Sequence, residues 1–204
     1  MKMGARLLAM TLVCAAMSSS AVADGFFLTA DAGALVYSNT ETLSYWGVEF
    51  TNPGAIDIGG GYRFTPNFGV EAGHTIIGDS DTSTIGFIGT SETLKSSVNH
   101  FAFVGTLPIG YRFGLFGKLG LARTTIDYSN SGVGLYESAS GSQTNLMLGF
   151  GWEYNFNRHW QVHAQYENFG TTNVGPIISN GVVLGGTGGD IGMSLFSVGG
   201  MYSF

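Results

Sequence analysis

The chain has 204 residues, of which 44% are hydrophobic and 13% aromatic, while only 11% are charged. This composition is too apolar for a disordered chain, and it is too poor in charge for an ordinary soluble helical domain, in which about 25% of residues are charged. The net charge of −6 at pH 7 argues against the basic surface of a nucleic-acid-binding protein. The length predicts one domain, or at most two small ones.

The first 23 residues have the pattern of a secretory signal peptide. Two basic residues precede an apolar run over residues 7–17, and residues 21–23 (Ala-Val-Ala) give the small-residue cleavage site. The run is too short to cross a bilayer as a helix, which takes about 20 residues, so an uncleaved anchor is disfavoured. A lipoprotein at Cys14 is also disfavoured, because Val13 precedes it. We predict cleavage after residue 23 and a mature domain over residues 24–204.

The mature domain alternates between large apolar residues and small or polar ones with a period of two, which is typical of strands with two different faces. The clearest run covers residues 146–156, where Phe150 and Trp152 share one face with other large residues, while Gly151 and Glu153 lie on the other. In chain order, the predicted strands cover about residues 25–37, 56–64, 68–76, 98–107, 114–125, 146–156, 160–167 and 191–204.

The connections between these eight strands fall into two classes that alternate strictly. Three are short turns, around Pro66, around Gly110 and around Arg158. The four others are long and polar or rich in glycine, and they cover residues 38–53, 78–97, 129–143 and 170–190. Membrane barrels show this asymmetry, with short periplasmic turns and longer extracellular loops. An even number of strands then places both termini on the periplasmic side.

The polarity of the strands distinguishes a membrane barrel from a soluble one. A soluble barrel buries its apolar face, whereas here the face with the charges is rich in glycine and the opposite face carries most large aromatic residues. Lipid suits such an aromatic face, so a soluble lipocalin-like barrel is the disfavoured alternative. The strand ends at the short turns carry a predicted periplasmic aromatic girdle: Phe64, Phe68, Phe156, Trp160 and Phe204.

Two features of the sequence resemble known outer membrane proteins. The last strand ends on Phe204 and is similar to the assembly signal of these proteins, with Phe196, Val198, Tyr202 and Phe204 on one face. Residues 61–73 resemble the second hairpin of the OmpA-like transmembrane β-barrel family. Residues 107–120 are similar to its middle hairpin, and residues 151–166 to its sixth and seventh strands. The chain ends without the peptidoglycan-binding domain of many members, so small stand-alone OmpX-like barrels and adhesins are the closer comparison.

This resemblance implies an internal network of acids and bases that plugs the barrel. Counting from the short turns, Glu71, Lys118, Glu153 and His163 face inward at similar heights, with Asp31 as a further member. Charges in a narrow lumen of low dielectric constant must pair, so we predict that Lys118 pairs with Glu71 or Glu153. A gated small pore is the alternative to a plug.

The sequence offers weak signals for catalysis or for bound ions. Barrels that resemble lipid A deacylases carry a Ser two positions after a His on one strand. None of the four histidines of this chain has a Ser two positions later. Asp79 and Asp81 supply too few oxygen ligands for a calcium loop. The glycine-rich residues 185–189 precede no helix that would complete a phosphate site. We expect no enzymatic activity, no metal and no cofactor.

The sequence therefore predicts an all-β protein of the Gram-negative outer membrane, an eight-stranded antiparallel up-and-down transmembrane β-barrel with a closed or very narrow lumen. We expect a structural role in envelope integrity. The alternatives are a surface adhesin or ligand-binding barrel that acts through its four extracellular loops, where residues 43–50, 85–88 and 176–178 are apolar or aromatic, and a small-solute or ion porin. The expected partners are membrane lipid, lipopolysaccharide, the outer membrane assembly machinery and, for an adhesin, host surface molecules. We expect no nucleic acid and a monomer.

Overall fold

The computed structural model describes residues 25–38, 52–78, 80–81, 91–132, 135–173, 178–179, 182–183 and 190–204. The predicted signal peptide lies outside these residues, as do the aromatic stretch 43–50 and the apolar stretch 85–88. Within the described part of the chain, no helix is long and apolar enough to cross a membrane.

Eight long antiparallel strands make the fold, as the sequence predicts. They are β1 (Gly25–Ser38), β2 (Gly54–Thr65), β3 (Phe68–Ile77), β5 (Ser91–Ile109), β6 (Phe113–Gly132), β7 (Leu135–Asn155), β8 (Trp160–Asn173) and β11 (Asp190–Ser203). Three strands of two residues add to the edges of this sheet: β4 (Ser80–Asp81), β9 (Ile178–Ser179) and β10 (Val182–Val183). The three predicted turns are confirmed, since β2–β3, β5–β6 and β7–β8 are each joined by a few residues.

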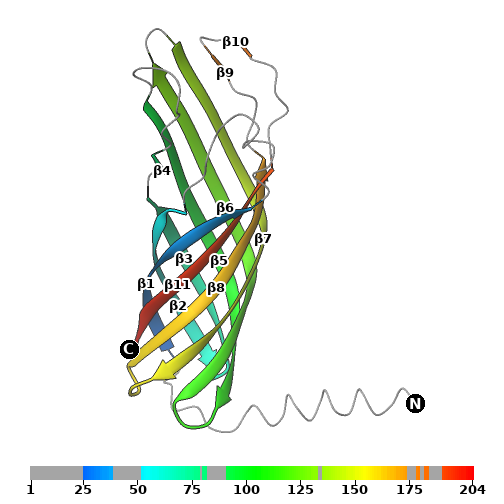
Figure 1. The fold of residues 1–204 in the computed structure, drawn as a ribbon. Coiled ribbons are helices and arrows are strands. Elements are labelled where there is room, and N and C mark those ends of the chain that lie inside the picture. Colours follow the sequence, from blue (N-terminus) through cyan, green and yellow to red (C-terminus); the bar gives the residue numbers. More distant parts are fainter. Residues whose placement is uncertain are drawn as a thin grey trace, which may run out of the picture.

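The sheet closes on itself into a barrel (Figure 1). Each long strand pairs with the next one along the chain, and the first pairs with the last, from Phe27 opposite Ser203 to Ser38 opposite Gly192. Closure gives the backbone N–H and C=O groups of every long strand a partner on both sides along the barrel, which is required in hydrocarbon because lipid offers no hydrogen bonds. The C-terminus lies at the end of the barrel that carries the short turns (Figure 1).

The strands on one wall extend farther than the sequence predicts. Residues 129–143 are predicted to be a loop, but β6 and β7 stay paired as far as Gly132 opposite Leu135, and they rise beyond the rest of the barrel (Figure 1). Likewise β5 begins at Ser91, inside the predicted loop 78–97. The error has a physical cause, because the sequences of these segments are mostly small and polar and lack the apolar alternation of a membrane strand, while backbone pairing continues without it.

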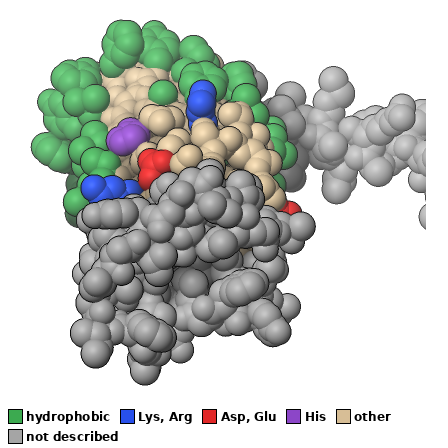
Figure 2. Space-filling view, turned by 90° about the horizontal axis from the view of Figure 1, so that it is seen from above, with side chains coloured by type: hydrophobic (Ala, Val, Ile, Leu, Met, Phe, Trp, Pro, Cys, Tyr) green, Lys and Arg blue, Asp and Glu red, His purple; other side chains and the backbone are tan. Residues whose placement is uncertain are grey.

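The outer wall of the barrel is apolar. Large side chains of alternate residues point away from the interior, such as Phe103, Phe150 and Val198, which are 63–65% exposed. In Figure 2, hydrophobic side chains follow much of the outer contour of the described residues, and the backbone and the small and polar side chains lie mainly inward of them. This arrangement is the reverse of a soluble barrel, as predicted, and it suits contact with lipid.

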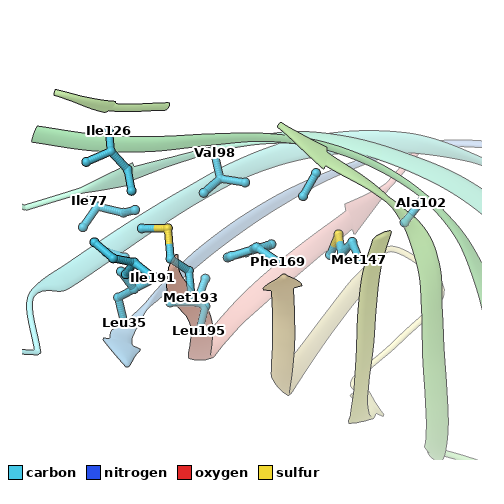
Figure 3. Packing of buried hydrophobic residues seen from close by; sticks show 12 residues of the cluster. Leu35, Ile77, Val98, Ala102, Ile126, Met147, Phe169, Ile191, Met193 and Leu195 are labelled. Atoms are coloured by element: carbon cyan, nitrogen blue, oxygen red, sulfur yellow. The ribbon is translucent and has the colours of Figure 1, made fainter. Parts of the chain in front are cut away.

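The interior corrects one expectation, since it is not polar throughout. Toward the long connections, the inward positions carry large apolar side chains that point into a common space (Figure 3). We call this group the apolar cluster: Leu35, Ala55, Ile77, Val98, Ala102, Ala122, Ile126, Met147, Phe169, Ile191, Met193 and Leu195. Both faces of a strand are apolar there. On β3, for example, Ile76 points outward and Ile77 points inward. At this height of the barrel, inward and outward residues therefore no longer differ in polarity, as they do on the rest of the strands.

A local irregularity in β8 shapes one side of the apolar cluster. Gly170 has φ of +78°, and a side chain at this position would collide with Asn145. The pairing of β8 with β11 shifts at the same height, between Gly192 and Ser194. Because of this bulge, Phe169 and Thr172 both point into the barrel although they are three residues apart.

Candidate functional site

The inward positions closer to the short turns hold a dense set of charged side chains, each at most 6% exposed. We call this group the charge layer: Asp31, Asp57, Arg63, Glu71, His100, Lys118, Glu153, His163 and Glu167. Every long strand except β11 contributes to it. A charge that is buried in this way must be paired, since desolvation would otherwise cost several kcal/mol per ion.

Lys118 on β6 lies between two carboxylates. Its Nζ donates to Glu71 Oε1 on β3 at 2.6 Å and to Glu167 Oε1 on β8 at 3.0 Å. The ammonium thus ties together three strands that are not neighbours in the sheet. Of the two partners that the sequence offered for Lys118, the structure places Glu71 in contact with it. The second contact, Glu167, was not expected.

Glu153 has a different cation. Its Oε2 lies 3.8 Å from Arg63 Nη2, and Gln161 bridges the two groups, since Gln161 Nε2 donates to Glu153 at 2.9 Å while Gln161 Oε1 accepts from Arg63 at 3.1 Å. This group lies nearest to the short turns. It forms the lowest part of the charge layer.

The two histidines of the charge layer each face carboxylates. His163 Nε2 lies 2.5 Å from Asp31 Oδ1, which connects β8 with β1 across β11. His100 lies between two acids, with Nδ1 at 3.8 Å from Asp57 Oδ1 and Nε2 at 3.7 Å from Glu71 Oε1. Both of these distances exceed hydrogen-bond length.

Glycines on neighbouring strands make room for the charged side chains. A Cβ on Gly73 would lie 2.5 Å from Cε1 of the His100 ring, and a Cβ on Gly114 would lie 2.9 Å from Glu153 Oε1. The glycine-rich inward face in the sequence therefore has a direct cause. Small residues on one strand leave the volume that a long charged side chain of the adjacent strand occupies.

The structure brings all five sequence-predicted lumen residues into the charge layer and adds four that were not named as members. Those four are Asp57, Arg63, His100 and Glu167. The signal for them was present in the sequence, because each lies on the inward face of a strand whose alternation was recognised. The prediction counted one lysine as the only cation, whereas the layer contains five carboxylates, two fixed cations and two histidines.

Small cavities remain beside the charge layer. One of about 10 Å³ is lined by Arg63, Lys118, Glu153 and His163, among others. A second of about 10 Å³ lies toward the short turns, next to Phe27 and other residues. Each has the volume for about one water molecule.

The residues of the predicted aromatic girdle all point outward at the short-turn end of the barrel, and each is 54–64% exposed. Tyrosines on the same strands join them: Tyr62 contacts Phe64, and Tyr202 contacts Trp160 and Phe204. The four predicted assembly-signal residues lie along the outer side of β11: Phe196, Val198, Tyr202 and Phe204. Aromatic rings with polar edges favour the boundary between lipid and water.

Solved structures of other small outer membrane barrels are similar to this fold. Ail, the attachment invasion locus protein of Yersinia pestis, is 16% identical with a TM-score of 0.55, and the match covers 89% of this chain and 100% of Ail. Neisserial surface protein A is 16% identical, covers 88% of this chain and 97% of its own, and has a TM-score of 0.57. OprG from Pseudomonas aeruginosa is 15% identical with a TM-score of 0.58, over 90% and 98% of the two chains. At these identities the likeness concerns the fold alone.

A comparison with curated protein sequences found no match. The sequence does match the family described as "Outer membrane protein beta-barrel domain" over residues 6–204. That match covers nearly the whole chain and agrees with the closed barrel, its apolar outer wall and its resemblance to OmpA-like proteins. The chain therefore belongs to the outer membrane protein β-barrel domain family, and its place is the outer membrane of a Gram-negative bacterium.

Proposed function

We propose that this protein is a structural component of the outer membrane whose lumen is closed. The observation that carries the proposal is the filling of the barrel by two successive groups of side chains. The charge layer bridges opposite walls through Lys118, and the apolar cluster fills the interior nearer the long connections. A continuous water path would have to break buried ion pairs and then cross an apolar region.

The histidine–carboxylate pairs fit a structural role better than a catalytic one. His163 with Asp31, and His100 with Asp57, have the elements of a general-base pair. Both pairs lie within the charge layer with side chains that are at most 3% exposed, so a substrate would have no contact with them. We infer that they hold strands together.

Conductance in planar bilayers tests the closed lumen. The purified protein, shown to be folded by its heat-dependent mobility on gels, is compared with Lys118→Ala, which removes the cation between Glu71 and Glu167. A control, Lys95→Ala, changes an exposed lysine outside the charge layer. We expect no discrete steps from the wild type or the control.

Discrete steps from the wild-type protein would contradict the closed lumen. If Lys118→Ala altered the size of those steps and Lys95→Ala did not, the result would instead favour the small-porin function, with the charge layer as its gate. Steps from Lys118→Ala alone would support the proposal, because they would show that the layer is what seals the wild-type barrel.

A second candidate function is binding at the cell surface, and the long hairpin favours it. β6 and β7 have 20 and 21 residues, whereas a tilted strand crosses the apolar band with about 9–11. About half of each strand therefore extends outside the membrane as an ordered platform. One structure of Ail, 18% identical to this chain with a TM-score of 0.57 over 89% of this chain and 100% of Ail, contains the heparin analogue sucrose octasulfate.

Exchange of the extended hairpin tests this second function. Residues 127–140 would be replaced by a two-residue type I′ turn, which joins β6 and β7 directly after the pair Ile126 and Gly141. Cells that express either form are then compared for attachment to host-cell monolayers and to heparin-coated surfaces. Loss of attachment with an intact heat-modifiable barrel would support surface binding, and equal attachment would leave the structural role as the better explanation.

A further inference from the structure

Three side chains of the charge layer converge, and the ion pairs with Lys118 account for their two carboxylates but not for the His100 ring, which is unbonded within the described residues. Glu71, His100 and Glu167 each offer one ligand atom, and these atoms lie within 4.8 Å of one another. They come from β3, β5 and β8, so the barrel brings together two walls to make the group. We propose that Glu71, His100 and Glu167 form a site for one divalent transition-metal ion, with Zn²⁺ as the probe ion.

The donor set and its spacing suit such an ion. Zn²⁺ binds imidazole nitrogen and carboxylate oxygen at about 2.0–2.2 Å, so two ligand atoms on a tetrahedral ion lie about 3.4 Å apart. His100 Nε2 and Glu71 Oε1 are 3.7 Å apart, which is a few tenths of an ångström more. One nitrogen and two carboxylate oxygens leave a fourth position for water or another ligand.

The far side of His100 faces a carboxylate, the group that supports many metal-binding histidines, at a distance beyond hydrogen-bond length. Asp57 Oδ1 lies 3.8 Å from Nδ1 of the ring, and the hydroxyl of Thr75 donates to the same Oδ1 at 2.7 Å. A carboxylate at the nitrogen opposite the metal fixes the tautomer of the ring and its orientation. Thr75 thus holds Asp57 beside Nδ1 of His100, while Nε2 of the same ring lies 3.7 Å from Glu71 Oε1.

A second observation comes from hydrogen bonding. The His100 side chain is fully buried, yet neither ring nitrogen has a hydrogen bond within the described residues. Glu167 Oε2 and Asp57 Oδ2 are also buried without a partner there. Unpartnered buried polar atoms are rare in native proteins and call for an explanation such as an ion. A metal ion at Nε2 would give that ring nitrogen and Glu167 a partner, whereas Nδ1 faces Asp57 on the opposite side of the ring.

Lys118 competes for the same carboxylates. Its Nζ contacts Glu71 Oε1 and Glu167 Oε1, and both carboxylates belong to the proposed site. Binding of the metal therefore requires the ammonium to leave these two oxygens. The cavity of about 10 Å³ that Lys118 shares with Glu153 lies beside it, and we infer that the side chain turns toward Glu153 when the ion binds. The three carboxylates around His100 supply the charge that a divalent ion needs.

The apolar cluster controls access to the site. The ring of Phe169 stacks on the ring of His100 with centroids 6.3 Å apart, and it covers the site from the side of the long connections. An ion therefore enters most readily before the barrel closes. We expect protein that is refolded in the presence of Zn²⁺ to retain it, and folded protein to exchange it slowly with a chelator.

The test measures zinc content per barrel after refolding into detergent with Zn²⁺, removal of free ion, and confirmation of folding by heat-dependent mobility. We expect one equivalent in the wild type and none in His100→Gln or Glu167→Gln. Asp57→Asn should lower the affinity about 10–100-fold, as loss of a supporting carboxylate does at known sites. Lys118→Met, which removes the competitor, should bind more tightly. The control His74→Gln changes an exposed histidine bonded to Asn99 and should keep one equivalent.

Two results would overturn the proposal. One is a wild-type barrel that retains no zinc, even if Lys118→Met binds it, because the natural chain would then lack the site. The other is zinc that persists in His100→Gln and Glu167→Gln but is lost in His74→Gln, which would place the ion on the surface. If one of the two ligand variants does not fold, the other decides, and the absorption spectrum of wild-type protein refolded with Co²⁺ reports the nitrogen–oxygen environment independently.

Discussion

The charge layer and the apolar cluster occupy the same barrel and differ in how each fills its interior. The charge layer uses a few long side chains that reach across the lumen, such as Lys118 between Glu71 and Glu167. The apolar cluster uses many side chains, including Leu35 and Met193, that meet from all walls. In the first, each contact is directional and has one partner. In the second, contacts are numerous and interchangeable.

This difference determines how each group responds to damage. Removal of one ion from a buried pair leaves the other charge desolvated and unpaired, and this loss has no local remedy. Removal of apolar atoms leaves a cavity that neighbours partly fill, and the cost depends on how far they relax. We therefore expect single substitutions in the two groups to differ in how far they lower the free energy of unfolding and in whether they open the lumen.

Lys118→Ala should have the largest effect. Glu71 and Glu167 would face each other without the cation between them, and we expect the free energy of unfolding to fall by about 3–5 kcal/mol. Urea unfolding in lipid vesicles measures it. Lys95→Ala, at an exposed position, should change stability by less than about 0.5 kcal/mol. Equal effects at the two positions would show that the Lys118 ion pairs contribute nothing to stability.

Leu35→Ala tests the apolar cluster in the same assay. Leu35 is fully buried, so its truncation should lower the free energy of unfolding by about 2–5 kcal/mol through lost contacts and a new cavity. Because the charge layer is untouched, we expect this variant to remain non-conducting in planar bilayers. Conductance of Leu35→Ala would indicate that the apolar cluster, and not the charge layer, seals the lumen.

Gly73→Ala tests the room that glycine leaves for a charged side chain. The added methyl group would meet the His100 ring, at 2.5 Å from Cε1, and the resulting overpacking should cost about 1–3 kcal/mol. Gly105→Ala is the matched control, because a Cβ there would lie 3.8 Å from the nearest ring atom of Phe68, an ordinary contact. Equal stability of the two alanine variants would contradict the assigned role of Gly73.

Sequence reasoning was accurate where the two faces of a strand differ in character and failed where they do not. The alternation over residues 146–156 identified the outward face of β7 and placed Glu153 inside. The same logic would have found Glu167 and Arg63, since both lie on recognised inward faces. It could not find the apolar cluster, because Ile76 and Ile77 are both apolar although only the second points inward.

The length of the hairpin and the convergence of the proposed metal ligands were beyond sequence reasoning for a different reason. Residues 129–132 and 135–143 form strands because backbone pairing propagates along β6 and β7, and their mostly small and polar sequence lacks the apolar alternation that would mark a strand. Glu71, His100 and Glu167 are far apart in the chain and meet only through barrel closure. No local spacing, of the kind that marks a metal motif, exists for residues that three separate strands supply.

The smallest expected effect is the energetic coupling between the charge layer and the apolar cluster, which is measured against the coupling within the charge layer. Lys118 and Glu167 share an ion pair, so Lys118→Ala and Glu167→Gln should be strongly non-additive, with an interaction energy of about 0.5–3 kcal/mol. Lys118 and Leu35 belong to different groups, and their double variant should be additive to within about 0.5 kcal/mol. Urea unfolding of the two double-mutant cycles measures both quantities. The ring of Phe169 stacks on His100 and so connects the two groups. A Leu35–Lys118 coupling as large as the Lys118–Glu167 coupling would therefore mean that the barrel interior acts as a single unit. Additivity would instead mean that each group can be altered separately, and that a change of lumen chemistry at the charge layer leaves the apolar cluster intact.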